Sequence, residues 1–204
     1  MIEALLIAAA QPAMTAIDAE RAFAADAQKI GQWTAFRKWA TADAVMFVPQ
    51  PGNAQGFLKG KADPPAAVFW WPGRSFVSCD GGTAINTGPW IRQWGKSVGY
   101  FTTVWQRQAN GSWKWVLDHG DALKAARAEG GDIEAIQAQC PNELLPSGPQ
   151  REVPADVKFG EGSSKDGTLR WNWVVMPDGS RTFWASIWNG RQHVVVLEDR
   201  VAAE

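Results

Sequence analysis

The chain of 204 residues is long enough for one large domain, or for one domain with a small appendage, and 46% hydrophobic residues can build a sizeable core. Lys and Arg number 20 against 21 Asp and Glu, and no basic run appears, so nothing favours a polyanionic partner such as nucleic acid. The 13 Trp residues suit either a thick core or an aromatic-walled cavity, because each indole is a large apolar plate.

Residues 1–14 are similar to the end of a secretory signal, because an apolar run at 4–10 is followed by small residues. The run lacks a basic segment and carries Glu3, so a disordered start is the alternative. It is too short to span a bilayer. We expect a periplasmic or exported protein, with a cytoplasmic location as the alternative.

The next part of the chain is predicted to be helical. Thr15–Asp18 is a capping-box pattern, and apolar residues then recur at helical spacing until Gly31, which predicts a first helix. A second short helix is predicted over 33–40, before the strand AVMFVP. Asp63 followed by proline predicts the start of a brief third helix, because proline suits the first helical position.

The segment from Arg74 to Asp121 has the pattern of strands joined by tight turns. The predicted strands are RSFVSC, TAINTGPWIRQ, VGYFTTVWQRQ and GSWKWVLDHGD, with a hairpin signal at Asn110-Gly111. Helices followed by a run of strands indicate an α+β layout. Residues 122–167 are predicted to hold two helical pieces, 122–128 and 132–140, and then a linker rich in Pro, Gly and Ser.

Residues 168–204 are predicted to form a β-meander extension of three strands. Two-residue alternation places four residues of its first strand on one face: Leu169, Trp171, Trp173 and Val175. The same rule groups His193, Val195 and Leu197 in its last strand. Three short strands rarely stand alone in water, so we expect the extension to pack on the main domain or on a partner.

Four segments carry a resemblance to a known family: AERAFAADA at 19–27, FRKWATADAVMFVP at 36–49, TGPW at 87–90, and YFTTVWQRQANGSWKWVLDHGD at 100–121. They are similar to the nuclear-transport-factor-two-like superfamily, and within it to the SnoaL-like group of small bacterial proteins. The resemblance implies that residues 15–121 form a cone-like α+β domain, a curved antiparallel sheet wrapped on two or three N-terminal helices. It also implies a homodimer through the open sheet face, and an apolar pocket in which Asp or His is the usual acid or base. The fold hosts many enzymes and binding modules, so it names no single function.

The strand at 111–121 carries one of only two histidines. Alternation assigns His119 and Asp121 to the face of Trp113, Trp115 and Leu117, and Asp118 to the other face. A carboxylate beside an imidazole fixes its tautomer and leaves the second nitrogen for a substrate, so His119 and Asp121 are the candidate catalytic pair. The alternative is structural: His119 satisfies backbone groups where the strand ends, and Asp121 caps a following helix.

Aromatic residues are the candidates for a ligand pocket. The predicted lining is Trp33, Phe36, Trp71, Trp90, Tyr100 and Trp115. The alternative for each is an ordinary place in the core or in an interface. No spacing of metal ligands, phosphate loop or hydrolase motif is present in the sequence, so we expect no metal and no cofactor.

Two cysteines, Cys79 and Cys140, allow one disulfide. They pair if the compartment is oxidising, and are otherwise small buried hydrophobic residues.

The leading functional hypothesis is a domain that binds a small apolar or aromatic molecule, with the meander as a lid or an interface. One alternative is a cofactor-free lyase or isomerase, in which His119 oriented by Asp121 moves a proton. Another is a structural interaction module of the cell envelope, whose tryptophans only fill core and interfaces. We expect a homodimer, no nucleic acid partner and no transmembrane segment.

Overall fold

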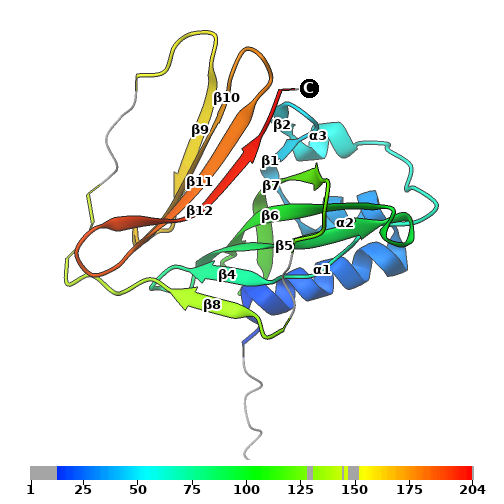
Figure 1. Ribbon diagram of the computed structural model, residues 1–204. Helices are drawn as coiled ribbons and strands as arrows, with labels where there is room; N and C mark the ends of the chain where they lie inside the picture. Colours follow the sequence, from blue (N-terminus) through cyan, green and yellow to red (C-terminus); the bar gives the residue numbers. More distant parts are fainter. Residues whose placement is uncertain (1–12, 128–130, 144, 147–151, 204) are drawn as a thin grey trace, which may run out of the picture.

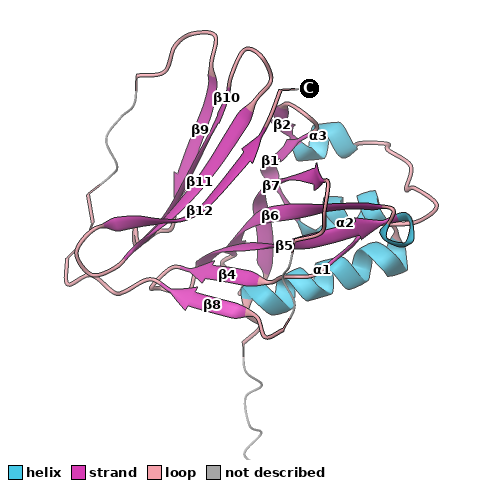
Figure 2. Cartoon of the chain, in the orientation of Figure 1, coloured by secondary structure: helices cyan, strands magenta, loops and turns pink. Residues whose placement is uncertain are grey.

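The computed structural model describes residues 13–127, 131–143, 145–146 and 152–203. The apolar run of the predicted signal remnant lies outside the described residues. The helices within them are α1 (Ala16–Ile30), α2 (Gln32–Trp39) and α3 (Ala54–Leu58), with a short 3-10 turn, η1 (Gln93–Gly95). Figure 2 shows that strands make up most of the rest. No described helix is long and apolar enough to cross a membrane.

The first two predicted helices are confirmed, and the third is wrong. The backbone N–H of Asp18 donates to the Thr15 hydroxyl, and the Asp18 carboxylate accepts from the N–H of Thr15, so the capping box is complete. The third helix, α3, instead begins after Asn53, whose side chain accepts from the N–H of Gly56. Asp63 cannot cap a helix of its own, because its carboxylate accepts from the N–H and hydroxyl of Thr34 in α2.

The described part of the chain forms an eight-stranded sheet in the order β2-β1-β7-β6-β5-β4-β8, with β3 paired to β5. Its strands are β1 (Ala40–Phe47), β2 (Pro51–Asn53), β3 (Phe69–Trp70), β4 (Arg74–Val77), β5 (Thr83–Arg92), β6 (Ser97–Arg107), β7 (Trp113–Leu123) and β8 (Glu134–Gln137). Helices α1 and α2 cover one face through a core that includes Phe23, Trp105 and Trp115. This arrangement confirms the predicted α+β class, a curved sheet wrapped on N-terminal helices. The sheet is mixed rather than antiparallel throughout, because β1 pairs with β7 in parallel.

The two helical pieces predicted after Asp121 are wrong within the described residues. Residues 122 and 123 extend β7, and 134–137 form β8, which pairs in parallel with β4. Tertiary pairing overrides local helix preference here, because the open edge of β4 offers backbone partners to β8. A disulfide between Cys79 and Cys140, with 5.1 Å between their Cα atoms, joins the chain just beyond both strands.

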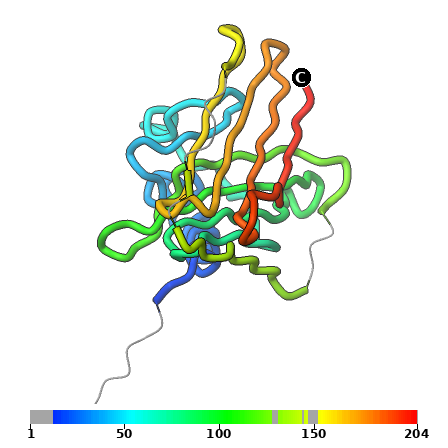
Figure 3. Tube along the Cα trace, turned by 90° about the vertical axis from the view of Figure 1, so that its left-hand side faces the viewer, coloured from blue at the N-terminus to red at the C-terminus, as the bar shows by residue number. Residues whose placement is uncertain are grey.

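The predicted C-terminal meander is confirmed, with one strand more than expected. The second sheet is antiparallel and consists of β9 (Lys158–Ser163), β10 (Leu169–Val175), β11 (Arg181–Trp188) and β12 (His193–Val201). Figure 3 shows β9 to β12 running side by side. The glycines that make β9 look like a linker have a packing role, because a Cβ at Gly160 or Gly162 would meet the indole rings of β10.

The second sheet packs against the face of the first sheet that the helices leave open (Figure 1). The shared core joins Phe76, Ile85, Val104 and Leu117 of the first sheet to Leu169, Trp171, Phe183 and Leu197 of the second. The expected packing of the extension on the main domain is therefore confirmed. The face through which the family resemblance implied dimerisation is occupied by the chain's own sheet, so a dimer would have to use another surface.

Candidate functional site

Strand β7 contains a β-bulge that reverses its alternation. Trp105 of β6 pairs with Trp115, whereas the preceding Val104 pairs with Leu117, so β7 holds one extra residue, Val116. Trp113 and Trp115 face the helices, and Leu117 faces the second sheet. The prediction that these residues and His119 share one face is wrong, because two-residue alternation holds only in a strand without a bulge.

Beyond the bulge, Asp118 lies on the face of the tryptophans and Asp121 on the opposite face, which is the reverse of the prediction. Asp118 pairs with Thr103 and faces the helices, on the same side as Trp115. His119 and Asp121 do share a face, as alternation predicts, but this face looks towards the second sheet. Pairing of β7 with β1 ends at Asp118, which leaves the following edge of β7 open.

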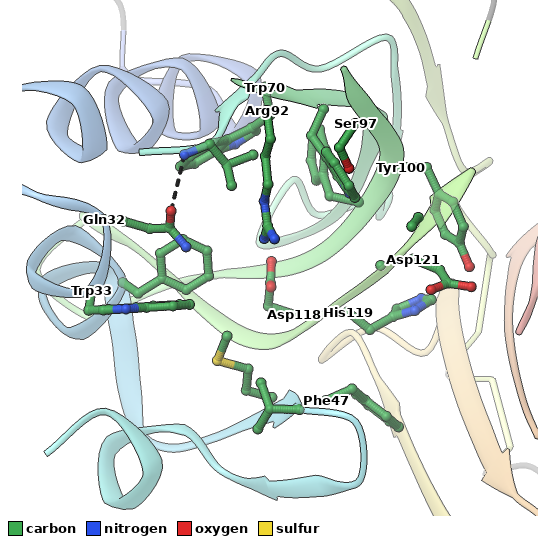
Figure 4. A pocket seen from close by; sticks show the side chains of 18 of the residues that line it. Gln32, Trp33, Phe47, Trp70, Arg92, Ser97, Tyr100, Asp118, His119 and Asp121 are labelled. Carbon is green, nitrogen blue, oxygen red and sulfur yellow. Dashed lines mark hydrogen bonds between the residues drawn. The ribbon is translucent and has the colours of Figure 1, made fainter. Parts of the chain in front are cut away.

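A cavity of about 340 Å³ lies between the helices and the sheet and continues past this open edge of β7. Such a volume is at the lower end of small-molecule sites, roughly 300–1,000 Å³. Aromatic residues are the largest group in its wall: Phe23, Trp33, Phe36, Phe47, Trp70, Trp90, Tyr100 and Phe101. Six of the lining residues are polar: Gln32, Arg92, Ser97, Asp118, His119 and Asp121 (Figure 4).

The structure brings four of the six residues predicted to line a pocket into this wall, namely Trp33, Phe36, Trp90 and Tyr100. Trp115 is fully buried in the core, where its ring lies 6.1 Å from that of Phe36. Trp71 lies outside the cavity, with its ring against Phe69.

Asp118 is the acidic group at the centre of the cavity. Protein surrounds its carboxyl, yet part of its surface is open to the cavity. Burial raises the pKa of Asp118 to about 7, and a hydrogen bond of 2.7 Å from the Thr103 hydroxyl opposes the rise only in part. Asp118 can therefore give or take a proton near neutral pH. Sequence reasoning missed it, because the bulge that turns it inward leaves no obvious sequence signal.

Arg92 is the positive group at the mouth of the cavity. Its guanidinium lies 4.9 Å from the centre of the Trp90 ring, a cation–π contact. Figure 4 shows its head group pointing into the cavity, towards the side that carries Asp118. The mouth thus offers a cation to a ligand, and the interior offers a carboxyl group that exchanges its proton near pH 7.

A second interior carboxyl, Glu20, lies behind the cavity wall. Its oxygens accept hydrogen bonds from the indoles of Trp70 at 2.9 Å and Trp105 at 2.6 Å, and from the amide of Asn86 at 3.3 Å. Burial, together with the charge of Asp118, raises the pKa of Glu20 to about 8. Glu20 fixes Trp70, which lines the cavity. An acidic residue on the apolar stripe of the first predicted helix is a signal that could have found it.

The histidine of the cavity contacts a different carboxylate from the one predicted. The Nε2 atom of His119 lies 3.4 Å from Oδ2 of Asp199 in β12, whereas Asp121 lines the cavity nearby. The Asp199 carboxylate also accepts from the Thr102 hydroxyl at 2.7 Å and from the Arg127 guanidinium at 2.9 Å. Burial alone would raise the pKa of Asp199, but these three contacts outweigh it and keep the pKa low. Sequence reasoning could not have found the pair, because it joins residues 80 positions apart on two different sheets.

Metal ligands are a separate question. The described residues contain no cluster of three or more His, Cys, Asp or Glu side chains that could hold a metal ion.

No family model matches the chain, and no curated protein matches it in sequence. Among solved structures, a candidate ketosteroid isomerase from Parabacteroides distasonis is 17% identical, with a TM-score of 0.42, over 53% of this chain and 88% of that one. A protein of unknown function from Pectobacterium atrosepticum is 11% identical, with a TM-score of 0.39, over 52% and 89%. A nuclear-transport-factor-two-like superfamily protein from Salmonella enterica is 14% identical, with a TM-score of 0.35, over 57% and 94%. This chain is similar to these proteins over about half of its length, and at such identities the likeness does not extend to activity.

Proposed function

We propose that this protein binds a small, mainly apolar or aromatic molecule in the cavity between α1, α2 and the first sheet. The observation that carries the proposal is the group of aromatic residues that lines a volume of about 340 Å³. An apolar ligand would replace water against these rings, which is favourable in proportion to the apolar area covered. Arg92 at the mouth and Asp118 in the interior would orient its polar substituents.

We propose an exported or periplasmic location for this activity. The support is the disulfide between Cys79 and Cys140, because such bonds persist in oxidising compartments.

Titration with 2-ethylnaphthalene tests the binding proposal, with binding followed by NMR at the methyl groups of Met46 and Val68, which line the cavity. We expect saturable shifts at these methyl groups and a rise in thermal stability with ligand concentration. The variant Ser97→Trp, which fills the lining with an indole, should abolish binding. Lys165→Trp adds the same indole at an exposed position outside the cavity and should leave binding unchanged. Absence of saturable binding by the natural chain would leave the interaction-module alternative.

A second candidate function is cofactor-free proton transfer, as in an isomerase or lyase. One observation favours it, namely a carboxyl group with a pKa of about 7 facing an aromatic cavity. The ionised Asp118 would remove a proton from a carbon next to a ligand carbonyl and return it to another position.

Deuterium exchange tests this second function. The protein is incubated with 2-tetralone in D₂O, and mass spectrometry measures deuterium incorporated next to the carbonyl group. Loss of about 100-fold or more of the protein-dependent rate in Asp118→Asn is expected, since a general base contributes roughly that much or more. An Asp118→Asn variant that binds 2-tetralone and exchanges it at the natural rate would remove this function.

A further inference from the structure

The end of the cavity that is lined by Tyr100, His119 and Asp121 contains a buried polar atom without a hydrogen-bond partner. It is the hydroxyl oxygen of Tyr100, a residue that is 3% exposed, whereas Nε2 of the neighbouring His119, which is 4% exposed, faces the Asp199 carboxylate at 3.4 Å. Both residues line the cavity, and Figure 4 shows them gathered with Asp121 at one end of it. Buried polar groups are almost always hydrogen-bonded, because leaving one unpaired is unfavourable. The Tyr100 hydroxyl therefore indicates a place where a bound molecule supplies the missing partner.

Tyr100 is equipped to donate a hydrogen bond. Burial raises its pKa, and the nearby carboxylates of Asp199 and Asp121 raise it further, so the phenol keeps its proton. The Arg127 guanidinium lies 4.3 Å from the ring centre and holds the ring from one side. The hydroxyl group is thus a fixed neutral donor at the end of an apolar cavity.

His119 is held in place from both sheets. Its ring lies 4.8 Å from that of Phe183 in β11 and 5.8 Å from that of Phe47 in β1. Asp199, which faces Nε2, is itself fixed by Thr102 and Arg127. An anion beside one ring nitrogen favours the tautomer with the proton on that nitrogen, so Asp199 orients the imidazole of His119.

We propose that Tyr100 and His119 form a second polar subsite, which binds an oxygen atom of the ligand, and that Asp199 of the C-terminal sheet is its positioning residue. This inference rests on the proposed binding function and names the ligand class: an aromatic or alicyclic body that carries a carbonyl oxygen. The ligand body lies against the aromatic wall, and its oxygen accepts from the Tyr100 hydroxyl. The C-terminal sheet is then part of the site as well as a cover for the first sheet.

Two probes of matched shape test the subsite. 2-Acetylnaphthalene has a carbonyl group where 2-ethylnaphthalene has a methylene group, and the affinity of each is measured by titration. We expect the carbonyl probe to bind about fivefold more tightly, the value of one net hydrogen bond. Its carbonyl stretching band, isolated by ¹³C labelling, should move to lower frequency on binding. In Tyr100→Phe both differences should disappear while 2-ethylnaphthalene still binds.

The outcomes separate the subsite from the binding function. Equal affinities for the two probes, with no effect of Tyr100→Phe, would overturn the subsite and leave the binding function intact. Failure of 2-ethylnaphthalene to bind would overturn the binding function itself.

The role of Asp199 is tested by NMR of the histidine side chains, since the chain has only two histidines. In Asp199→Asn the ring nitrogen shifts of His119 should change, because an amide replaces the anion, and the carbonyl probe should lose its advantage. His193 is the internal control, since its Nε2 contacts the Gly167 carbonyl at 2.8 Å and should not respond. Thr102→Val, which removes one donor to Asp199, is a milder second variant and should shift His119 in the same direction. Unchanged His119 shifts and an unchanged affinity ratio in a folded variant would overturn the positioning role.

Discussion

At the scale of single residues, the interior of the domain is distinguished by two carboxyl groups that hold protons more tightly than usual. Asp118 is open to the cavity, and Glu20 is sealed behind it by two indole N–H groups and an amide. Burial raises both pKa values, to about 7 and about 8. The same desolvation that suits Asp118 for proton exchange makes it unfavourable to the fold when it is ionised.

The variant Asp118→Asn should therefore be more stable than the natural chain at alkaline pH. An unfolded aspartate titrates near about 3.9, so the folded state binds more protons between that pH and about 7, and stability falls as pH rises through this window. Asparagine stays neutral and can still accept from Thr103. We expect its free energy of unfolding to exceed that of the natural chain by about 4 kcal/mol at pH 8, and the difference to vanish below pH ~4. Denaturant titrations across this range measure it, with the exposed Asp156→Asn as the control.

Glu20→Gln should destabilise the fold even where Glu20 carries no charge. The glutamine amide has only one accepting oxygen, so its NH₂ group would face the N–H of Trp70 or Trp105. At pH 6, where the natural Glu20 is mostly protonated, we expect a loss of about 1–3 kcal/mol in the free energy of unfolding, the cost of a buried unpaired donor. Near-ultraviolet circular dichroism should change as well, because two tryptophans lose their anchor. A variant as stable as the natural chain would mean that Glu20 is not needed to hold them.

At the scale of elements, the sequence was informative wherever local rules decide the structure. The capping box at Thr15 sets the start of α1, and the hairpin turns set the order from β4 to β7. Alternation failed at two bulges, which depend on packing between strands: one at Val116, and one in β12, where Ser186 pairs with Val195 but Ala185 pairs with Leu197. Val195 is consequently 64% exposed, whereas Leu197 is buried, so their predicted common face is wrong.

These bulges also explain why the candidate site was only partly predictable. The aromatic lining follows from residue type, whereas the choice between Asp118 and Asp121 depends on a single extra residue in β7. Asp199 belongs to a sheet whose docking position no local pattern encodes.

The glycines of β9 give a test at the element scale. An added Cβ at Gly162 would come within 2.2 Å of the Trp171 ring, so Gly162→Ala must displace a buried indole. We expect a loss of roughly 1–3 kcal/mol, seen as a lower melting temperature. Gly52→Ala in β2 is the matched control, since nothing lies within 4 Å of its added Cβ, and it should change stability by less than about 0.5 kcal/mol. Equal melting temperatures for the two variants would show that β9 does not pack as described.

At the scale of the whole molecule, the two sheets share one core, and the disulfide between Cys79 and Cys140 links two segments beside that core. Cys79 follows β4, and Cys140 follows β8, while the N–H of neighbouring Gln139 donates to the carbonyl of Trp188 in the second sheet. The N–H of Cys79 likewise donates to the Thr168 hydroxyl of that sheet. The disulfide therefore lies at the junction where β4, β8 and the C-terminal sheet meet.

Breaking this disulfide should weaken the whole domain. Its cysteines are 61 positions apart, and closing a loop of that length in the unfolded chain corresponds to about 4 kcal/mol in the chain-entropy model. We expect Cys79→Ser/Cys140→Ser to lose about this amount in one cooperative transition, because both sheets share a core. Denaturant titration followed by both tryptophan fluorescence and the His193 ring signals, one reporter dominated by the first sheet and one in the second, measures the loss. Two separate transitions would show that the sheets unfold independently. Asp199 could then separate from His119 while the first sheet and its helices stay folded.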